Sequence, residues 1–144
     1  MQMVTMALGS CLGIVLYDGE IKVGAMAHVM HPYRDGVKNN SNKAKFVDSA
    51  IAVMLGKMQK RGARRKRIIA KIFGGACMFD HVVNNREVLQ IGDKNVKAAR
   101  DVLEQLDIAI AGESVGGNTG RTICFNLADG TVVVRDAFDN KERY

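Results

Sequence analysis

The chain has 144 residues, of which 47% are hydrophobic and 25% are charged, and its formal net charge is +6. This length and balance predict one globular domain with its own core, spanning residues 1–144. No apolar run approaches the length of a membrane-spanning helix, and no charged-then-apolar leader begins the chain. The three cysteines, Cys11, Cys77 and Cys124, lack CxxC spacing. This pattern disfavours a disulfide framework or a zinc site and predicts a reducing, cytoplasmic location.

Three short apolar runs open the chain and predict strands at residues 4–8, 12–17 and 23–30. Because the connections between them are short, we expect the three strands to be neighbours in one mainly antiparallel sheet. Cys11 lies at the bend between the first two runs, and His28 lies near the end of the third. A thiol and an imidazole that meet in this way are the minimum apparatus for nucleophilic attack on a carbonyl.

Two helices are predicted further along. Residues 44–61 carry apolar side chains at three- and four-residue spacing, and Gly62 suits the position that follows a helix. Residues 93–106 have a second apolar face, with Asp93 as the expected N-cap.

The remaining strands are expected in the second half of the chain, with a charged tail that frays after them. Their ranges are 68–73, 108–112, 122–127 and 131–135, the last two joined by a turn at Asp129-Gly130. About seven strands and two main helices, with short connections between the first strands, predict a layered α+β sandwich rather than a doubly wound parallel sheet.

The cysteines and histidines differ in their local surroundings. Cys124, between two apolar residues, is expected to be a small buried hydrophobe, and Cys77 to be structural as well. Cys11 follows Gly9-Ser10, a bend at which backbone N–H groups are free to point at a developing oxyanion. His31 is expected to face the other side of the sheet from His28, and His81 to be solvated.

Much of the positive charge lies in residues 57–67, at the end of the first predicted helix. One interpretation is a solvated helix end, where cations are favoured by the helix dipole. The alternative is a docking patch for an acidic partner. Nucleic acid is not expected as that partner, because few aromatic residues are interleaved with these charges. The polar loop 33–45 follows the His28 strand, and either connects elements or acts as a lid or docking segment.

Residues 5–11 (Thr-Met-Ala-Leu-Gly-Ser-Cys), followed by residues 24–28 (Gly-Ala-Met-Ala-His), resemble the CheD family of bacterial chemotaxis proteins, the chemoreceptor glutamine deamidases. The resemblance runs in order from Thr5 to about Arg135. Its later matches are the glycine turn 74–79, the segment 91–96 that contains Asn95, and the loop 116–118 with Arg121 after it.

The resemblance implies a role for each matching residue. Cys11 falls on the nucleophile, His28 on the general base, and Thr5 on the residue that orients the imidazole. Gly9 and Ser10 fall on the bend that supports the oxyanion. The implied fold is an α/β/β sandwich similar to the catalytic domain of cytotoxic necrotizing factor toxins, with no metal or organic cofactor.

Two positions depart from the family pattern. His31 stands where an apolar residue is common, and Cys77 replaces a usual serine. His31 is therefore a histidine near the site without an assigned role, and Cys77 is an additional thiol.

The implied activity is deamidation of glutamine side chains on the helical cytoplasmic region of chemoreceptors, through a cysteine thioester. The implied partners are those receptors and a CheC-type phosphatase, with no nucleic acid and no membrane insertion. Candidate docking residues are Tyr33, Arg61, Arg64, Arg65 and Phe79. The alternatives are a non-catalytic module that stimulates the phosphatase and a receptor glutamyl methylesterase. A nucleic-acid-binding domain would rest on the net charge alone.

Overall fold

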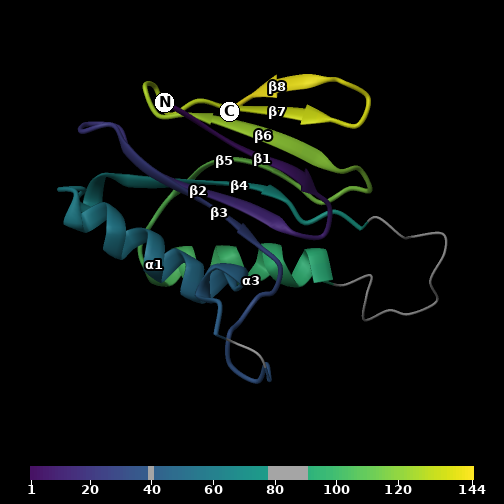
Figure 1. Ribbon diagram of the computed structural model, residues 1–144, viewed down its shortest axis with the longest axis horizontal. Helices are drawn as coiled ribbons and strands as arrows, with labels where there is room; N and C mark the ends of the chain where they lie inside the picture. Colours follow the sequence, from purple (N-terminus) through teal and green to yellow (C-terminus); the bar gives the residue numbers. More distant parts are fainter. Residues whose placement is uncertain (39–40, 78–90) are drawn as a thin grey trace.

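The computed structural model describes residues 1–38, 41–77 and 91–144. These residues form three layers: a four-stranded sheet, a second four-stranded sheet, and two helices that cover the second sheet (Figure 1). The layered α+β arrangement predicted from the sequence is therefore confirmed, with eight strands in the described part rather than about seven. None of the helices in these ranges combines the length and apolar character needed to cross a membrane.

The strand order of each sheet differs from the order in the sequence. The first sheet is antiparallel and consists of β1 (Gln2–Leu8), β6 (Arg121–Asn126), β7 (Val132–Asp136) and β8 (Lys141–Arg143), in that spatial order. The second consists of β3 (Val23–Val29), β2 (Leu12–Asp18), β4 (Ile68–Gly74) and β5 (Ile110–Val115). In the second sheet β4 and β5 are parallel, and the other pairs are antiparallel.

The two main helices are α1 (Val47–Lys60) and α3 (Ile91–Gln105). Two short 3-10 turns, Lys43–Lys45 and Arg65–Arg67, flank α1. The helix predicted at 44–61 thus begins later, because residues 43–45 form a separate turn. Asp93 lies inside the first turn of α3 rather than at its N-cap, where its charge still favours the positive end of the helix dipole.

The first three strands do not share one sheet, so that expectation was wrong. β1 pairs with β6, whereas β2 and β3 pair with each other in the second sheet. The chain crosses from the first sheet to the second at the Gly9–Cys11 bend. As a result, Leu8 before the bend and Leu12 after it are buried in different cores. Leu8 packs between the two sheets, and Leu12 packs between the second sheet and the helices. As a result β1 and β3 are edge strands of different sheets.

β2 is the central strand of the molecule, and all seven of its residues are buried. Its alternate side chains enter the two cores: Ile14 and Leu16 face the helices, and Val15 and Tyr17 face the first sheet. At Gly13 the two sheets approach closely. A Cβ atom there would lie 2.9 Å from the terminal methyl carbons of both Leu8 and Ile123, so a larger residue would require these side chains to shift.

The C-terminal tail does not fray as expected. β8 pairs with β7, and the backbone N–H groups of Tyr144 and Val132 each donate to the other residue's carbonyl, at 2.9 Å. The Tyr144 ring packs edge-on against the buried Phe73 ring, with centroids 5.6 Å apart. The tail therefore closes one side of the core between the sheets.

Asp18, which is fully buried, ties the end of β2 to the basic turn after α1. Its carboxylate accepts hydrogen bonds from the Arg67 guanidinium, with an Nη2–Oδ2 distance of 2.8 Å, and from the backbone N–H of Arg64 at 3.0 Å. The Arg67 hydrogen bond is the main reason that the pKa of Asp18 is below its ordinary value, and burial opposes this shift.

We expect Asp18→Ala to lower the free energy of unfolding by about 2 kcal/mol at pH 7, because it removes the acceptor of the Arg64 N–H and the main partner of Arg67, which keeps Glu20 at 3.4 Å. Since the folded-state pKa is lowered, this stabilisation is present above the unfolded-state pKa and is lost as the pH falls through the folded-state value. Urea unfolding at several pH values measures both effects, with Glu104→Ala on the exposed side of α3 as the control. Equal stability of wild type and Asp18→Ala at pH 7 would contradict the prediction.

Candidate active site

Thr5 and His28 meet across the two sheets. Thr5 lies on β1 and His28 on β3, and the Thr5 Oγ1 atom is 2.9 Å from the His28 Nδ1 atom. The hydrogen bond is compatible with either neutral tautomer of the imidazole. When Nδ1 carries the proton and donates to Thr5, Nε2 is the unprotonated atom and can accept a proton from a neighbour.

Cys11 lies beside this pair, directly before β2. In the β2–β3 ladder Gly13 is opposite His28. Because Cys11 is two residues before Gly13, strand alternation directs Cys11 and His28 to the same face of the sheet, the face toward the first sheet. Cys11 is half-buried and packs against the core between the sheets. Cys11 and His28 therefore lie on the same face at the same end of the second sheet, and in the part of the chain that the structure describes their side chains are not hydrogen-bonded to each other.

Partial desolvation changes the acidity of both reactive groups, although His28, on an edge strand, remains exposed. Desolvation raises the pKa of the Cys11 thiol, an effect partly opposed by the residue's own backbone N–H. It lowers the pKa of His28. Both shifts favour the uncharged form of each group, and therefore favour a thiol and a neutral imidazole over a thiolate and an imidazolium.

The carbonyl groups of the Cys11 loop are all anchored to other segments. The Gly9 carbonyl accepts from the Ala76 N–H at 2.8 Å, the Ser10 carbonyl from the Asn95 side chain at 3.0 Å, and the Cys11 carbonyl from the Gly75 N–H at 2.9 Å.

In a trans peptide the N–H points away from the carbonyl of the same unit. The N–H groups of Ser10 and Cys11 are therefore directed away from these anchors. Within residues 1–38, 41–77 and 91–144 neither N–H donates to another residue's carbonyl. Both N–H groups are therefore candidate oxyanion donors, and that of Cys11 also lies near its own sulfur.

The glycine turn after β4 supports this loop from behind. Gly74 has φ +102°, and a Cβ atom there would lie 2.4 Å from the Cys11 carbonyl oxygen. A side chain at this position would therefore displace the loop. The Gly74 carbonyl accepts from the Gly116 N–H at 2.9 Å, and the Arg121 Nη2 atom donates to the Gly116 carbonyl at 2.9 Å. The Cys11 loop, the glycine turn after β4 and the loop at Gly116 are far apart in the sequence, yet these contacts join them into one structural unit.

A β-bulge in β1, just before the loop, was not foreseen. In the pairing with β6, Thr5 is opposite Ile123 and Leu8 is opposite Arg121, so β1 has one extra residue. Ala7, inside the bulge, has φ 57°, a left-handed conformation that costs a residue with a Cβ about 1 kcal/mol. The bulge turns the chain from Thr5 into the Cys11 loop. An uninterrupted apolar run gives no sign of it.

Within the described ranges, no hydrogen bond or ring contact joins Cys77, Cys124 or His31 to the Thr5–His28 pair. Cys124 is half-buried, so the expectation of a buried residue was wrong: β6 buries its neighbours Ile123 and Phe125 and turns Cys124 to the outer face. Cys77 is also half-buried. His31 lies beyond the end of β3 and is exposed, with its ring against Phe46. Phe79 and His81 lie outside the described residues.

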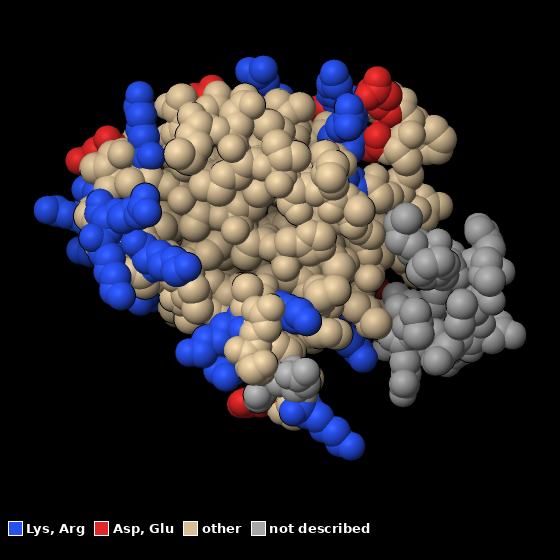
Figure 2. All heavy atoms as spheres, viewed as in Figure 1, with Lys and Arg blue, Asp and Glu red and all other residues tan. Residues whose placement is uncertain are grey.

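The basic residues 57–67 lie at the far end of the sheet from Cys11. In the β2–β4 ladder, Leu12 opposite Gly74 marks the Cys11 end, and Asp18 opposite Ile68 marks the basic end. Six residues of strand separate them, about 20 Å. Lys and Arg side chains gather there, where α1 ends and β4 begins (Figures 1 and 2).

The candidate docking residues differ in their contacts. Arg61 and Arg64 are exposed at the basic end. The Arg65 Nε atom donates to the Leu106 carbonyl at 2.8 Å, so this side chain is held against the end of α3. Tyr33 lies in the loop after β3, on the Cys11 side of the molecule, and is 45% exposed. The docking candidates therefore fall into two separate surfaces.

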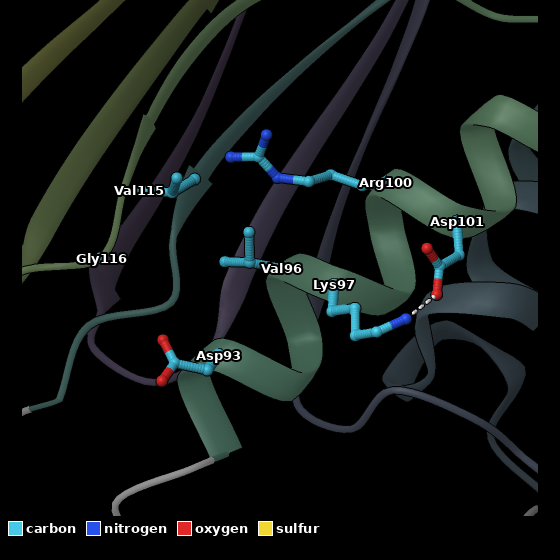
Figure 3. Close-up of a pocket in the computed structure, with 7 residues that line it drawn as sticks. All are labelled: Asp93, Val96, Lys97, Arg100, Asp101, Val115 and Gly116. Carbon is cyan, nitrogen blue, oxygen red and sulfur yellow. Dashed lines mark hydrogen bonds and ion pairs between the residues drawn. The ribbon is translucent and has the colours of Figure 1, made fainter.

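Two hollows flank the site region. A groove of about 290 Å³ lies between β3 and α1, and its lining includes His28, Met26, Val53 and Lys57. A second, of about 380 Å³, lies between α3 and the end of β5 (Figure 3). It is lined by Asp93, Val96, Lys97, Arg100, Asp101, Val115 and Gly116. Its opposite charges are paired in part, as between Lys97 and Asp101 at 2.6 Å, and none of the residues predicted to be catalytic lines it. The described residues contain no cluster of three or more His, Cys, Asp or Glu side chains placed to hold a metal ion.

Comparison with known proteins places the chain among chemotaxis proteins. The family model described as "CheD chemotactic sensory transduction" matches residues 30–136. A protein of Caldanaerobacter subterraneus subsp. tengcongensis, named a probable chemoreceptor glutamine deamidase CheD, is 47% identical over 131 residues, which cover 91% of this chain and 80% of that protein. Proteins with the same name from Moorella thermoacetica and Clostridium novyi are 42% and 43% identical over 134 residues. These alignments cover 93% of this chain and 80% and 82% of those proteins. The chain belongs to the CheD family.

Proposed function

We propose that this chain is a single-domain, cytoplasmic enzyme that deamidates glutamine side chains of bacterial chemoreceptors. Family membership and the names of the relatives support the reaction and its substrate. The observation that carries the assignment to particular residues is the hydrogen bond between Thr5 and His28 at 2.9 Å, beside the loop of Cys11. This geometry supplies a nucleophile, a base and a residue that orients the base.

In the proposed mechanism the His28 Nε2 atom takes the proton of the Cys11 thiol while the sulfur attacks the amide carbon of the substrate. A C–S bond forms and the carbonyl becomes an oxyanion. When the oxyanion collapses, the C–N bond breaks and His28 returns the proton to the leaving ammonia. Water then hydrolyses the thioester with His28 as base, which releases glutamate and restores the thiol. These steps use only groups of the chain, the substrate and water.

The N–H groups of Ser10 and Cys11 are the proposed oxyanion donors, with the Gly9 bend placing them and the Ser10 hydroxyl as a further donor. Each well-placed donor typically contributes about 3 kcal/mol to transition-state stabilisation. The carbonyl groups of the same two peptide units belong to Gly9 and Ser10, and they are already held by Ala76 and Asn95. Little reorganisation of these peptides is therefore needed when the negative charge develops.

Thr5 has a limited role in this mechanism. Its neutral hydroxyl fixes the direction of the imidazole and can accept the Nδ1 proton in the reactive tautomer, whereas a carboxylate would also stabilise the imidazolium. The lowered pKa of His28 agrees with a partner that adds no negative charge. Proton transfer and attack on the amide are therefore expected to occur together, after the substrate has bound.

The direct test is incubation of the full chain with a chemoreceptor cytoplasmic fragment, followed by peptide mass mapping. Conversion of glutamine to glutamate at defined positions is the expected result. If the fragment binds and no glutamine is converted, the proposal is wrong. A methylated fragment in a parallel reaction separates a methylesterase, because that activity releases methanol instead of ammonia.

The pH dependence of Cys11 alkylation tests the neutral resting pair. Since burial raises the thiol pKa, we expect the rate with iodoacetamide to be low at pH 7 and to rise as the pH passes above the ordinary range of a free thiol. Peptide mapping assigns the modified cysteine, and Cys77 serves as the internal comparison. A rate that is already at its plateau between pH 5 and pH 7 would show a preformed thiolate–imidazolium pair and contradict the prediction.

The partners proposed for this chain are the helical cytoplasmic region of chemoreceptors and a CheC-type phosphatase. A long helical partner is able to reach both Cys11 and the basic end, where Arg61 and Arg64 are exposed. If charge reversal of both arginines leaves the KM for the receptor fragment unchanged, this contact is excluded. A chain that activates the phosphatase and converts no glutamine would favour the alternative of a binding module.

A further inference from the structure

Asn95 is fully buried in α3, one turn after the helix begins, and its side chain contacts two segments of the candidate active site. The Nδ2 atom donates to the Ser10 carbonyl at 3.0 Å and to the Met30 carbonyl at 3.2 Å. Because both acceptors are carbonyl oxygens, the amide nitrogen and not the oxygen must face them. Both protons of the Asn95 amide are thus engaged.

The two carbonyls belong to the two halves of the proposed machinery. Ser10 shares its peptide unit with the N–H of Cys11, which is one of the proposed oxyanion donors. Met30 lies two residues after His28, at the point where β3 ends. One side chain therefore connects the loop of the nucleophile to the strand of the base.

We propose that Asn95 is a positioning residue for the deamidation: it fixes the spacing of Cys11 and His28 and turns the Ser10–Cys11 peptide so that its N–H faces the substrate. This inference rests on the proposed function. Asn95 itself touches no reacting atom. It acts through the two backbone segments that it holds.

The packing of α3 shows how Asn95 reaches so far into the site. A Cβ atom on Gly92 would lie 2.5 Å from the Gly75 carbonyl oxygen and 2.9 Å from that of Ala76. The helix therefore lies directly against the turn that also holds the Gly9 and Cys11 carbonyls. Gly92 permits the close approach, and Asn95, three residues later on the same buried face, uses it.

The amide at position 95 is not explained by packing alone. Its Oδ1 atom is buried and has no hydrogen-bond partner in the part of the chain that the structure describes. A buried acceptor without a partner is destabilising, and an apolar side chain of similar size would avoid that cost. The asparagine is therefore best explained by its two N–H donors, which hold the carbonyl groups of Ser10 and Met30.

The test compares Asn95→Ala with Leu103→Ala, a variant of the same helix that removes a buried side chain far from the loop. We expect Asn95→Ala to lower kcat on the receptor fragment about 100-fold with KM changed less than about twofold, because a displacement of about 1 Å is enough for such a loss. Leu103→Ala, studied at a temperature where both variants are folded, is expected to keep kcat within about threefold of wild type.

Asn95→Asp gives a second readout that a structural role would not move. Burial raises the pKa of a carboxyl group, and only its neutral form can donate to a carbonyl. The activity of this variant is therefore expected to fall as the pH rises, over a range in which wild-type activity rises. Circular dichroism at each pH restricts the comparison to folded protein, and iodoacetamide labelling of Cys11 follows the same change without a receptor.

The outcomes separate the two proposals. Loss of deamidation in Cys11→Ala with full kcat in Asn95→Ala would overturn the role of Asn95 and leave the proposed function standing. An equal loss of kcat in Leu103→Ala would also overturn it, since the effect would then follow stability. If Asn95→Ala does not fold, the comparison of Asn95→Asp with wild type decides, and parallel pH profiles overturn the inference. Activity that survives in Cys11→Ala refutes the proposed function instead.

Discussion

Replacing Cys11 with alanine is expected to reduce deamidation of a chemoreceptor fragment below detection while leaving the fold intact. Alanine removes the sulfur that is proposed to form the thioester, and the neighbouring hydroxyls of Thr5 and Ser10 are weaker nucleophiles than a thiol. Cys11 is only half-buried and lies at the edge of the sandwich, so the loss of one sulfur atom leaves a small space rather than a large internal cavity. Peptide mass mapping after incubation of equal amounts of wild type and variant measures the effect.

Cys77→Ser and Cys124→Ala are the matched controls for this experiment, because each removes a half-buried thiol outside the Thr5–His28 arrangement. Both are expected to retain wild-type activity. Conversion by Cys11→Ala at the wild-type rate would refute the assignment of the nucleophile. A loss in Cys77→Ser as large as that in Cys11→Ala would move the assignment to the glycine turn.

Local patterns in the sequence predicted most of the elements of this fold. The apolar run 68–73 is β4 with one further residue, and the turn at Asp129-Gly130 joins β6 and β7 as expected. Gly62 has φ +94° at the position predicted to follow the first helix. These features depend on side-chain periodicity and on the conformational freedom of glycine, both of which are visible in a single sequence.

The assignment of strands to sheets depends on contacts that local patterns do not contain. β1 pairs with β6, more than 100 residues later in the chain, because Leu8 and Ile123 are buried in the same core. The tail illustrates the same limit: its charged residues read as a frayed end, yet backbone hydrogen bonds between Tyr144 and Val132 hold it in the first sheet. In both cases a distant partner decides the local structure.

The candidate residues of the site came from the sequence, and their arrangement came from the structure. The resemblance to the family identified Thr5, Cys11 and His28. The sequence alone placed all three in one sheet, whereas the hydrogen bond between Thr5 and His28 joins two sheets. Asn95 was noted as a matching position without a role, since only its two contacts in space reveal one.

His28→Ala is the second variant for which a large effect is expected. Burial raises the pKa of the Cys11 thiol and so favours its neutral form, which needs a base to react; we therefore expect kcat/KM to fall about a thousandfold. In the wild type the rate falls as the pH drops through the lowered pKa of His28, because a protonated imidazole cannot accept the thiol proton. The variant lacks this group. The residual kcat/KM of the variant is expected to increase with pH until the Cys11 thiol is itself ionised. At such a pH the difference in kcat/KM between the variant and the wild type becomes smaller.

Two further variants show whether the effect belongs to His28 in its observed contact. Thr5→Val keeps the shape of the side chain and removes the hydroxyl. We therefore expect a smaller loss of kcat/KM, about tenfold, and activity that still requires the Cys11 thiol. His31→Ala removes an exposed imidazole three residues away and is expected to have little effect. If His31→Ala costs as much as His28→Ala, the base has been assigned to the wrong ring. If the pH profile of His28→Ala matches that of the wild type, the proton is taken by another group, and the hydrogen bond to Thr5 serves only the stability of the sandwich edge.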